Sequence, residues 1–263
     1  MHPMPLPATL DQGTGHTAVF LLHGVGAGKE AWAGNLDAVA GAGYRAIAWD
    51  MPGYGGSATV EPYTTSALAL ALENLIDHVG ASCNVLLGHS MGGMVAQEAV
   101  ALFPRKIHGL VLSATSAAFG SADGTWQQQF LERRFLRLDA GLGMAGLARH
   151  LVPTLMAPQA SSLSCAKATA LMAHVPEASY RRALRTVVAF DRLDNLQNIA
   201  VPTLCLAGEF DRTATPSVMQ KMGQHIPGAQ YRCLASVGHL ANMERADAFN
   251  AAVLAFLQLH FPI

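Results

Sequence analysis

Short apolar runs alternate with longer segments in which apolar residues recur at helical spacing over most of the chain. A short apolar run between turn residues is consistent with a buried β-strand, whereas apolar positions at i, i+3, i+4 and i+7 indicate an amphipathic helix. Runs of the first kind predict six strands, at residues 17–22, 44–49, 84–87, 109–113, 203–206 and 230–234.

Helices are expected between and after these strands. They span residues 31–42, 66–79, 93–103, 216–225 and 246–260. In the last of them one stripe is apolar, formed by Phe249, Ala252, Val253, Phe256 and Leu257. Strands that alternate with helices need crossover connections, so the pattern predicts the α/β class with a mostly parallel sheet flanked by helices.

One block breaks the alternation. Residues 119–190 contain no convincing strand, and helical patterns cover 126–138, 162–174 and 177–190. Prolines at positions 153, 158 and 176 favour several short helices over one long one. An insertion of about 70 helical residues after a sheet strand predicts a helical cap over the strand ends. We therefore expect an α/β core formed by residues 1–118 and 191–263, interrupted by the cap at residues 119–190.

Composition removes several function classes. The 263 residues are 51% hydrophobic and 13% charged, with a formal net charge of −1. No basic run exists, so nucleic-acid binding has no support. No apolar run approaches the 18 residues that a membrane-spanning helix needs, and the first residues lack the features of a signal peptide. We expect a cytoplasmic protein that acts on a small molecule and binds no membrane; its oligomeric state stays open.

Metal and disulfide chemistry are also unsupported by the sequence. The four cysteines show no C-x-x-C spacing and read as reduced packing residues. The 11 histidines include no H-x-x-x-H or H-E-x-x-H pattern, so we expect no metal and no organic cofactor.

The most informative motif is Gly-His-Ser-Met-Gly at residues 88–92. It lies between a predicted strand and a predicted helix, the context in which G-x-S-x-G forms a sharp turn with an exposed serine. Glycines allow that turn because they add no Cβ to the crowded bend. The motif predicts Ser90 as a nucleophile, which needs a neighbouring base to be reactive.

Three further positions supply partners for Ser90. Asp211 and His239 each follow a predicted strand, and a serine nucleophile needs a histidine base that a carboxylate orients. The order Ser90, Asp211, His239 is that of the α/β-hydrolases. Glu209 is the rival acid, placed two residues earlier. An oxyanion hole is expected from the backbone N–H groups of Val25, in the loop after the first strand, and Met91.

Other polar residues near these motifs are interpreted as structural. Asp50 precedes a Pro-Gly turn and is expected to bond local backbone. His23 is expected to stabilise its own turn, and His89 to orient the loop of the nucleophile.

Taken together the motifs resemble the α/β-hydrolase superfamily over nearly the whole chain outside the block 119–190. The segments that carry the resemblance are HGVG, DMPGYGGS, GHSMGG, GEFDRTATP and VGHLANME…FNAAVLAFL. The chain is most similar to capped hydrolases such as 3-oxoadipate enol-lactonases, carboxylesterases and meta-cleavage product hydrolases. The resemblance implies Ser90 as nucleophile, His239 as base and Asp211 as orienting acid, with Val25 and Met91 at the oxyanion hole.

Two departures refine the expected reaction. Only about 16 residues precede the first strong strand, so the N-terminal ribbon usual in the superfamily is expected to be shortened or partly missing. His89 stands where the carbon–carbon hydrolases commonly have asparagine, which favours hydrolysis of an ester or lactone through an acyl-enzyme. Carbon–carbon bond hydrolysis of vinylogous diketones and a ligand receptor with slow turnover remain alternatives.

Substrate choice is assigned to the cap. Trp126, Phe130 and Met144 are candidates for the walls of an apolar pocket, although packing between the helices is the favoured explanation for any single one of them. The arginine pairs 133/137 and 181/185 are candidates for holding a substrate carboxylate, with an exposed charged face as the favoured explanation. The sequence leaves the substrate itself open.

Overall fold

A single seven-stranded sheet forms the centre of the computed structural model, which describes residues 5–121 and 123–263. In spatial order the strands are β1–β3–β2–β4–β5–β6–β7. Their bounds, in chain order, are β1 Thr9–Gln12, β2 Thr17–Leu22, β3 Arg45–Trp49, β4 Cys83–His89, β5 Gly109–Ser113, β6 Thr203–Gly208 and β7 Gln230–Leu234.

All neighbouring strands are parallel except β1, which pairs antiparallel with β3 at the edge of the sheet. The six predicted strands are confirmed within two residues at each end. Sequence analysis missed β1, because four residues with two exposed positions carry too little apolar pattern to identify a strand. The mostly parallel sheet flanked by helices confirms the predicted fold class.

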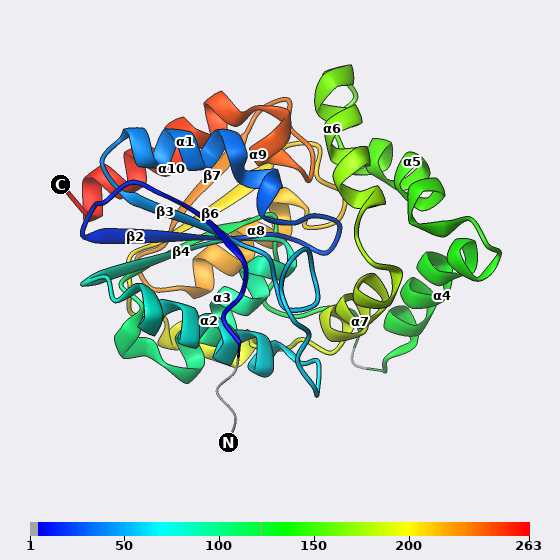
Figure 1. Cartoon of the computed structure of the whole chain (residues 1–263), viewed down its shortest axis with the longest axis horizontal. Coiled ribbons are helices and arrows are strands. Elements are labelled where there is room, and N and C mark those ends of the chain that lie inside the picture. The colour runs from blue at the N-terminus through cyan, green and yellow to red at the C-terminus, as the bar shows by residue number, and fades with distance from the viewer. Residues whose placement is uncertain (1–4, 122) are drawn as a thin grey trace.

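Helices cover both faces of the sheet (Figure 1). One face carries α2 Thr65–Val79, α3 Met91–Leu102 and α8 Pro216–His225, and the other carries α1 Ala33–Gly41 and α10 Ala246–His260. Strand β2 shows why both faces need covering, since Phe20 packs into the core on the α3 side and Val19 and Leu21 into the core on the α10 side. Such a strand is apolar throughout, as expected in a parallel sheet buried on both sides.

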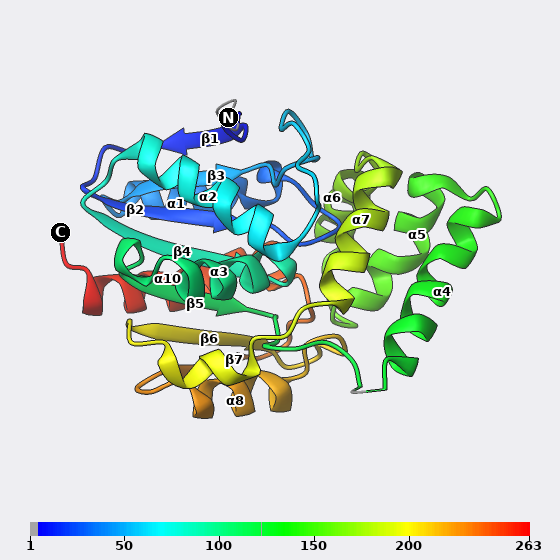
Figure 2. The same ribbon diagram turned by 90° about the horizontal axis from the view of Figure 1, so that it is seen from below.

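Four helices stand apart from these layers, at the end of the sheet where the parallel strands finish (Figure 2). This four-helix block consists of α4 Thr125–Asp139, α5 Gly143–Leu155, α6 Ser162–Ala173 and α7 Glu177–Val188. The segment that enters the block and the segment that leaves it lie side by side. Phe119 N donates to Phe190 O, and Arg192 N donates to Ala117 O. The block is thus a single insertion between β5 and β6 with one narrow neck.

Helix α5 is the element of the block that sequence analysis missed. Pro153 was expected to separate helices but lies inside α5. It falls within the last turn of the helix, so the hydrogen bond that its nitrogen cannot donate to the carbonyl four residues earlier is lost only near the helix end. None of the described helices is both long enough and apolar enough to cross a membrane.

The start of α3 lies against the end of β2 with almost no space between them. A Cβ at Gly92 would overlap the carbonyl oxygen of Leu22 and stand 2.6 Å from its carbonyl carbon. We expect Gly92→Ala to lower the free energy of unfolding by about 1–3 kcal/mol or more, because two main chains must separate to admit one methyl group. Urea denaturation followed by circular dichroism measures this loss.

Gly34→Ala is the matched control. Gly34 also lies in a helix, but a Cβ there would meet nothing within 4 Å. Alanine at such a site is expected to raise the free energy of unfolding by up to about 1 kcal/mol. Equal effects of the two substitutions would contradict the close approach of α3 to β2.

Candidate active site

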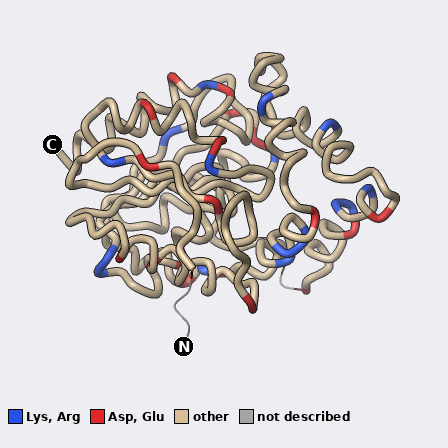
Figure 3. Tube along the Cα trace, in the orientation of Figure 1, with Lys and Arg blue, Asp and Glu red and all other residues tan. Residues whose placement is uncertain are grey.

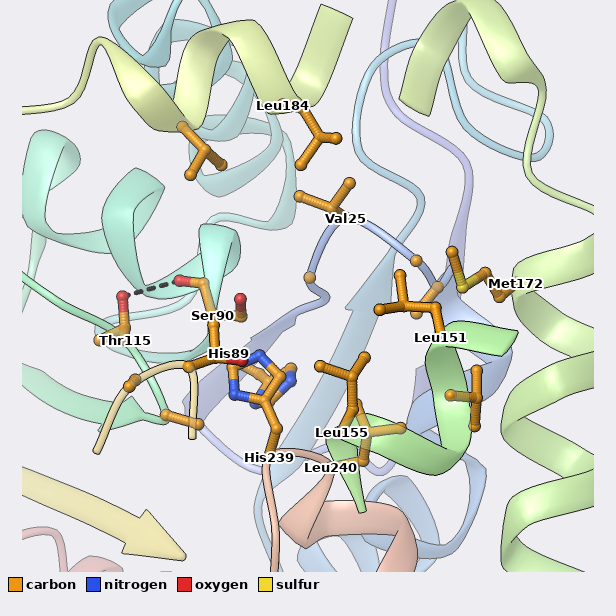
Figure 4. A pocket seen from close by; sticks show the side chains of 18 of the residues that line it. Val25, His89, Ser90, Thr115, Leu151, Leu155, Met172, Leu184, His239 and Leu240 are labelled. Atoms are coloured by element: carbon orange, nitrogen blue, oxygen red, sulfur yellow. Dashed lines mark hydrogen bonds between the residues drawn. The ribbon is translucent and has the colours of Figure 1, made fainter. Parts of the chain in front are cut away.

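Ser90 lies at the sharp turn between β4 and α3, with a left-handed φ of 53° and a ψ of −119°. Such a conformation is strained for a residue with a side chain and persists only where its surroundings fix it. Here the Ser90 amide donates to Ser113 O at 2.9 Å, and its carbonyl accepts from the Thr115 hydroxyl at 2.7 Å (Figure 4). These bonds to β5 and the loop after it hold the serine at the carboxyl end of the sheet.

His239 and Asp211 are brought together by the loops that follow β7 and β6. The Nδ1 atom of His239 lies 2.8 Å from Asp211 Oδ2. The other oxygen of Asp211 accepts from the amides of Thr213 at 2.7 Å and Ala214 at 3.1 Å, and its side chain is fully buried. A carboxylate held in this way fixes the imidazole with Nδ1 protonated, which leaves Nε2 free to accept a proton.

Ser90 and His239 line the same cavity, and Figure 4 shows both side chains beside it. No described residue forms a hydrogen bond with the Ser90 hydroxyl. In enzymes without substrate the contact between nucleophile and base is often long and shortens when substrate binds. The rival acid Glu209 is exposed and accepts from the Ser236 amide outside the cavity, so the structure pairs His239 with Asp211.

The two expected oxyanion donors flank Ser90. Val25 lies in the loop after β2 and lines the cavity, while Met91 begins α3 directly after the serine. Among the described residues neither backbone amide donates a hydrogen bond. The loop of Val25 is fixed from behind, because the Tyr54 hydroxyl donates to the Val25 carbonyl at 3.0 Å. Both amides can therefore serve a ligand that lies beside Ser90.

The cavity lies between the carboxyl ends of the strands and the four-helix block, and its volume is about 140 Å³. An apolar cavity of about 150 Å³ accommodates one benzene ring, so the enclosed space suits a small molecule. Most of its wall is apolar, and the residues labelled in Figure 4 that form this wall are Val25, Leu151, Leu155, Met172, Leu184 and Leu240.

The three residues proposed from sequence for the pocket wall have different positions. Phe130 lines the cavity. Trp126 does not; it is 42% exposed and stacks on Phe130 with ring centroids 5.4 Å apart. Met144 is buried in the core that the block shares with the sheet and is likewise outside the lining. Their shared hydrophobicity could not distinguish the inner face of a helix from its packing face.

A model of the alpha/beta hydrolase family matches residues 19–252 of the chain. The chain belongs to this family. The seven-stranded sheet and the serine at the strand–helix turn agree with the fold of this family.

The relatives of this α/β hydrolase carry the names of different activities. Polyketide synthase ThaQ of Burkholderia thailandensis is 30% identical over 81% of the chain, which spans only 10% of that protein. The 2-hydroxy-6-oxononadienedioate/2-hydroxy-6-oxononatrienedioate hydrolase of Burkholderia vietnamiensis is 28% identical over 94% of the chain and 89% of its own length. The reaction of this hydrolase therefore cannot be transferred from one relative alone.

Two solved structures share almost the entire fold of the hydrolase. A malate-bound esterase of Thermogutta terrifontis has a TM-score of 0.87 at 27% identity, covering 96% of this chain and 93% of its own. The enol-lactonase of Burkholderia xenovorans LB400 has a TM-score of 0.84 at 26% identity, with 95% of each chain covered. These findings support the expected resemblance to esterases and lactonases.

Glu244 is a site residue that sequence analysis did not single out. Its buried carboxylate accepts hydrogen bonds from the amides of Gly238 at 3.0 Å and Leu240 at 3.1 Å, on either side of His239. It also accepts from Ala157, just beyond α5, at 2.8 Å. One carboxylate thus joins the loop of the histidine to the four-helix block. The sequence gave no signal for this link to the block, because Ala157 and Glu244 lie 87 residues apart in the chain.

Asp50 and His23 take the structural roles expected of them, and for His89 the structure shows a packing contact. Asp50 accepts from the Lys29 amide and ammonium group and from the Gly56 amide. His23 bonds its own loop through the Gly24 carbonyl and accepts from the Met51 amide. His89 packs beside His239, with ring centroids 5.0 Å apart.

Within the described residues, no cluster of His, Cys, Asp or Glu could hold a metal ion.

His23 and His89 make the stability of the hydrolase depend on pH. Burial lowers the pKa of His23 below 6.5 and that of His89 well below it, the latter with further lowering from His239 and His23. In the unfolded chain both take up protons near pH 6.5, so the unfolded state binds more protons at lower pH. The free energy of unfolding should fall below pH 6.5 by up to about 1.4 kcal/mol per pH unit for each histidine.

Urea denaturation at several pH values between 8 and 5.5 measures the slope of the free energy of unfolding against pH. His89→Gln should reduce this slope, whatever its effect on stability at high pH. His78→Gln, at an exposed position on α2, should leave the slope unchanged. A slope in His89→Gln equal to that of the wild type would contradict a buried neutral imidazole.

Proposed function

We propose that the protein is a serine hydrolase that cleaves a small carboxylic ester or lactone through an acyl-enzyme. Ser90 is the nucleophile, His239 the base and Asp211 the orienting acid, and the amides of Val25 and Met91 form the oxyanion hole. The observation that carries this proposal is the 2.8 Å contact between His239 and the buried Asp211, at a cavity that Ser90 also lines.

Each step of the reaction uses a group already at the cavity. His239 Nε2 takes the proton of Ser90 as its oxygen attacks the carbonyl carbon, and the two amides stabilise the negative charge that develops on the carbonyl oxygen. The imidazolium, stabilised by Asp211, then gives the proton to the departing alcohol or enol. A water molecule repeats the sequence on the acyl-enzyme and releases the acid.

The four-helix block is proposed as the cap that selects the substrate. It supplies much of the cavity wall, including Phe130 from α4, Leu151 from α5, Met172 from α6 and Leu184 from α7. Burial beneath these side chains excludes water and strengthens the electrostatic interactions at the carbonyl. The residues 119–190 would then determine which acyl or alcohol group fits, while the sheet supplies the chemistry.

Carbon–carbon bond hydrolysis is the second candidate function, supported by the name of the Burkholderia vietnamiensis relative. Ester or lactone hydrolysis ranks first because both quoted structural neighbours carry the names esterase or enol-lactonase. Histidine at position 89 also departs from the asparagine common in carbon–carbon hydrolases. Initial rates on aryl esters, lactones and vinylogous 1,5-diketones rank the candidates.

Ser90→Ala is expected to lower kcat at least about 10³-fold on every ester or lactone that the wild type cleaves, because the nucleophile is lost. Initial rates measure the loss. Ser116→Ala is the matched control, since Ser116 lines the same cavity and has no proposed chemical role; it should keep most of the activity. Turnover by Ser90→Ala near the wild-type rate would refute the nucleophile assignment.

Asp211→Asn should lower kcat by about 10⁴-fold while the protein stays folded, because the amide no longer enforces the correct histidine tautomer. Glu209→Gln changes a carboxylate two residues away that is exposed and outside the cavity, and it should leave kcat near that of the wild type. The reverse order of effects would assign the acid to Glu209.

A further inference from the structure

Arg134 is a charged side chain in the otherwise apolar part of the cavity wall. It lies on α4 one turn after Phe130, and its guanidinium carbon lies 5.2 Å from the centroid of that ring. The side chain is half-buried and lines the cavity. No described residue forms a hydrogen bond or an ion pair with it. Even a half-buried charge at an apolar wall loses part of its hydration, so we expect the ligand to supply the ionic partner that the protein lacks.

Arg134 differs in this respect from the arginines considered from sequence. Arg181 forms ion pairs with Asp139 and Glu177, and both Arg181 and Arg185 lie over the ring of Phe135. Arg133 and Arg137 are exposed. None of these four lines the cavity, whereas Arg134 does. Neither arginine pair considered from sequence lines the cavity, so the carboxylate role that was the less favoured explanation does not apply to them there.

Tyr180 on α7 provides a second unpaired donor at the same wall. The residue is 2% exposed and lines the cavity, and no described residue bonds its hydroxyl group. Burial raises the pKa of Tyr180, and the nearby positive charge of Arg134 acts in the opposite direction. Tyr180 precedes Leu184 by one turn and so shares its face of α7, which Figure 4 shows across the cavity from Ser90.

We propose that Arg134 and Tyr180 form a subsite for a carboxylate, so that the hydrolase acts on small esters or lactones that carry one carboxylate group away from the bond that is cleaved. This inference rests on the proposed function and adds the substrate class to it. The planar guanidinium offers two parallel N–H donors to a carboxylate, and the phenol adds a third donor. The anion would sit under the cap while Ser90 attacks the carbonyl group.

Charge balance favours a carboxylate over a phosphate. Arg134 brings one positive charge to the cavity wall, which one carboxylate neutralises. A phosphate monoester carries about 1.5 to 2 negative charges at pH 7 and would leave charge uncompensated in an apolar cavity. Among the described residues that line the cavity, Arg134 is the one lysine or arginine.

The distribution of charge along the chain agrees with an anionic substrate. Residues 119–190 contain eight Lys and Arg against four Asp and Glu, whereas the rest of the chain contains nine against fourteen. Figure 3 shows several of these basic residues gathered on α4 and α7. A positive field around the entrance to a cavity raises the local concentration of anions and their rate of association.

Matched pairs of substrates test the subsite, each pair differing only by a carboxylate or an isopropyl group of similar shape. The pairs are the 4-nitrophenyl esters of glutarate and 5-methylhexanoate, phenyl butyrates with a 3-carboxylate or a 3-isopropyl group, and γ-butyrolactones with an acetate or an isobutyl arm. In at least one pair we expect kcat/KM to favour the anionic member by tenfold or more.

Variants of Arg134 and Tyr180 should reduce this preference. Arg134→Gln should lower the ratio of anionic to neutral kcat/KM by roughly 10- to 100-fold, because a charge-assisted pair of hydrogen bonds is lost. Arg134→Lys keeps the positive charge but loses the paired N–H donors of the guanidinium, so its ratio should lie between those of the wild type and Arg134→Gln. Tyr180→Phe should lower the ratio by roughly 3- to 10-fold. Arg133→Gln, which removes an exposed charge from the same helix, should keep the ratio.

Binding of glutarate to Ser90→Ala, measured by calorimetry, tests the subsite without turnover. Weaker binding by the double variant Ser90→Ala/Arg134→Gln supports the subsite even if no ester is cleaved, in which case the proposed function alone fails. The inference is overturned if the neutral member is preferred in every pair, if Arg134→Gln lowers both members equally, or if glutarate binding does not depend on Arg134.

Discussion

The contact between the start of α3 and the end of β2 constrains the entire site. Because Gly92 lies against the Leu22 carbonyl, the chain must turn between β4 and α3 within a single residue, and Ser90 takes up that turn with its φ of 53°. The strain, about 1–3 kcal/mol for such a conformation, is balanced by the packing of the helix on the sheet. The same closeness brings the loop of Val25 beside the serine.

The sheet and most helices could be predicted from the sequence because burial on two faces leaves a strong pattern. Strand β2 is apolar at nearly every position, and α10 has one apolar stripe, so neither needs tertiary information to be recognised. The edge strand β1 and helix α5 could not be predicted in this way. The first has exposed positions and takes its partner from β3, and the second contains Pro153, which local rules read as a boundary.

The order of Ser90, Asp211 and His239 could be predicted because each follows a recognisable strand, and parallel strands end at one edge of the sheet. Contacts within the cap carry no such signal. Arg134 follows Phe130 by four residues, so the two share a face of α4, but adjacent Arg133 looks the same in sequence. Only the packing of α4 against α7 shows which of the two arginines faces inward.

The narrow neck of the four-helix block makes the insertion exchangeable. Its ends leave the sheet as hydrogen-bonded neighbours, so a different block with the same end spacing could be grafted between β5 and β6 without altering the sheet. Such a chimera must still reproduce two main-chain contacts of the present block. The Leu155 carbonyl accepts from the His239 amide, and the Ala157 amide donates to Glu244. Swapped blocks that lack these two groups would leave the histidine loop unsupported.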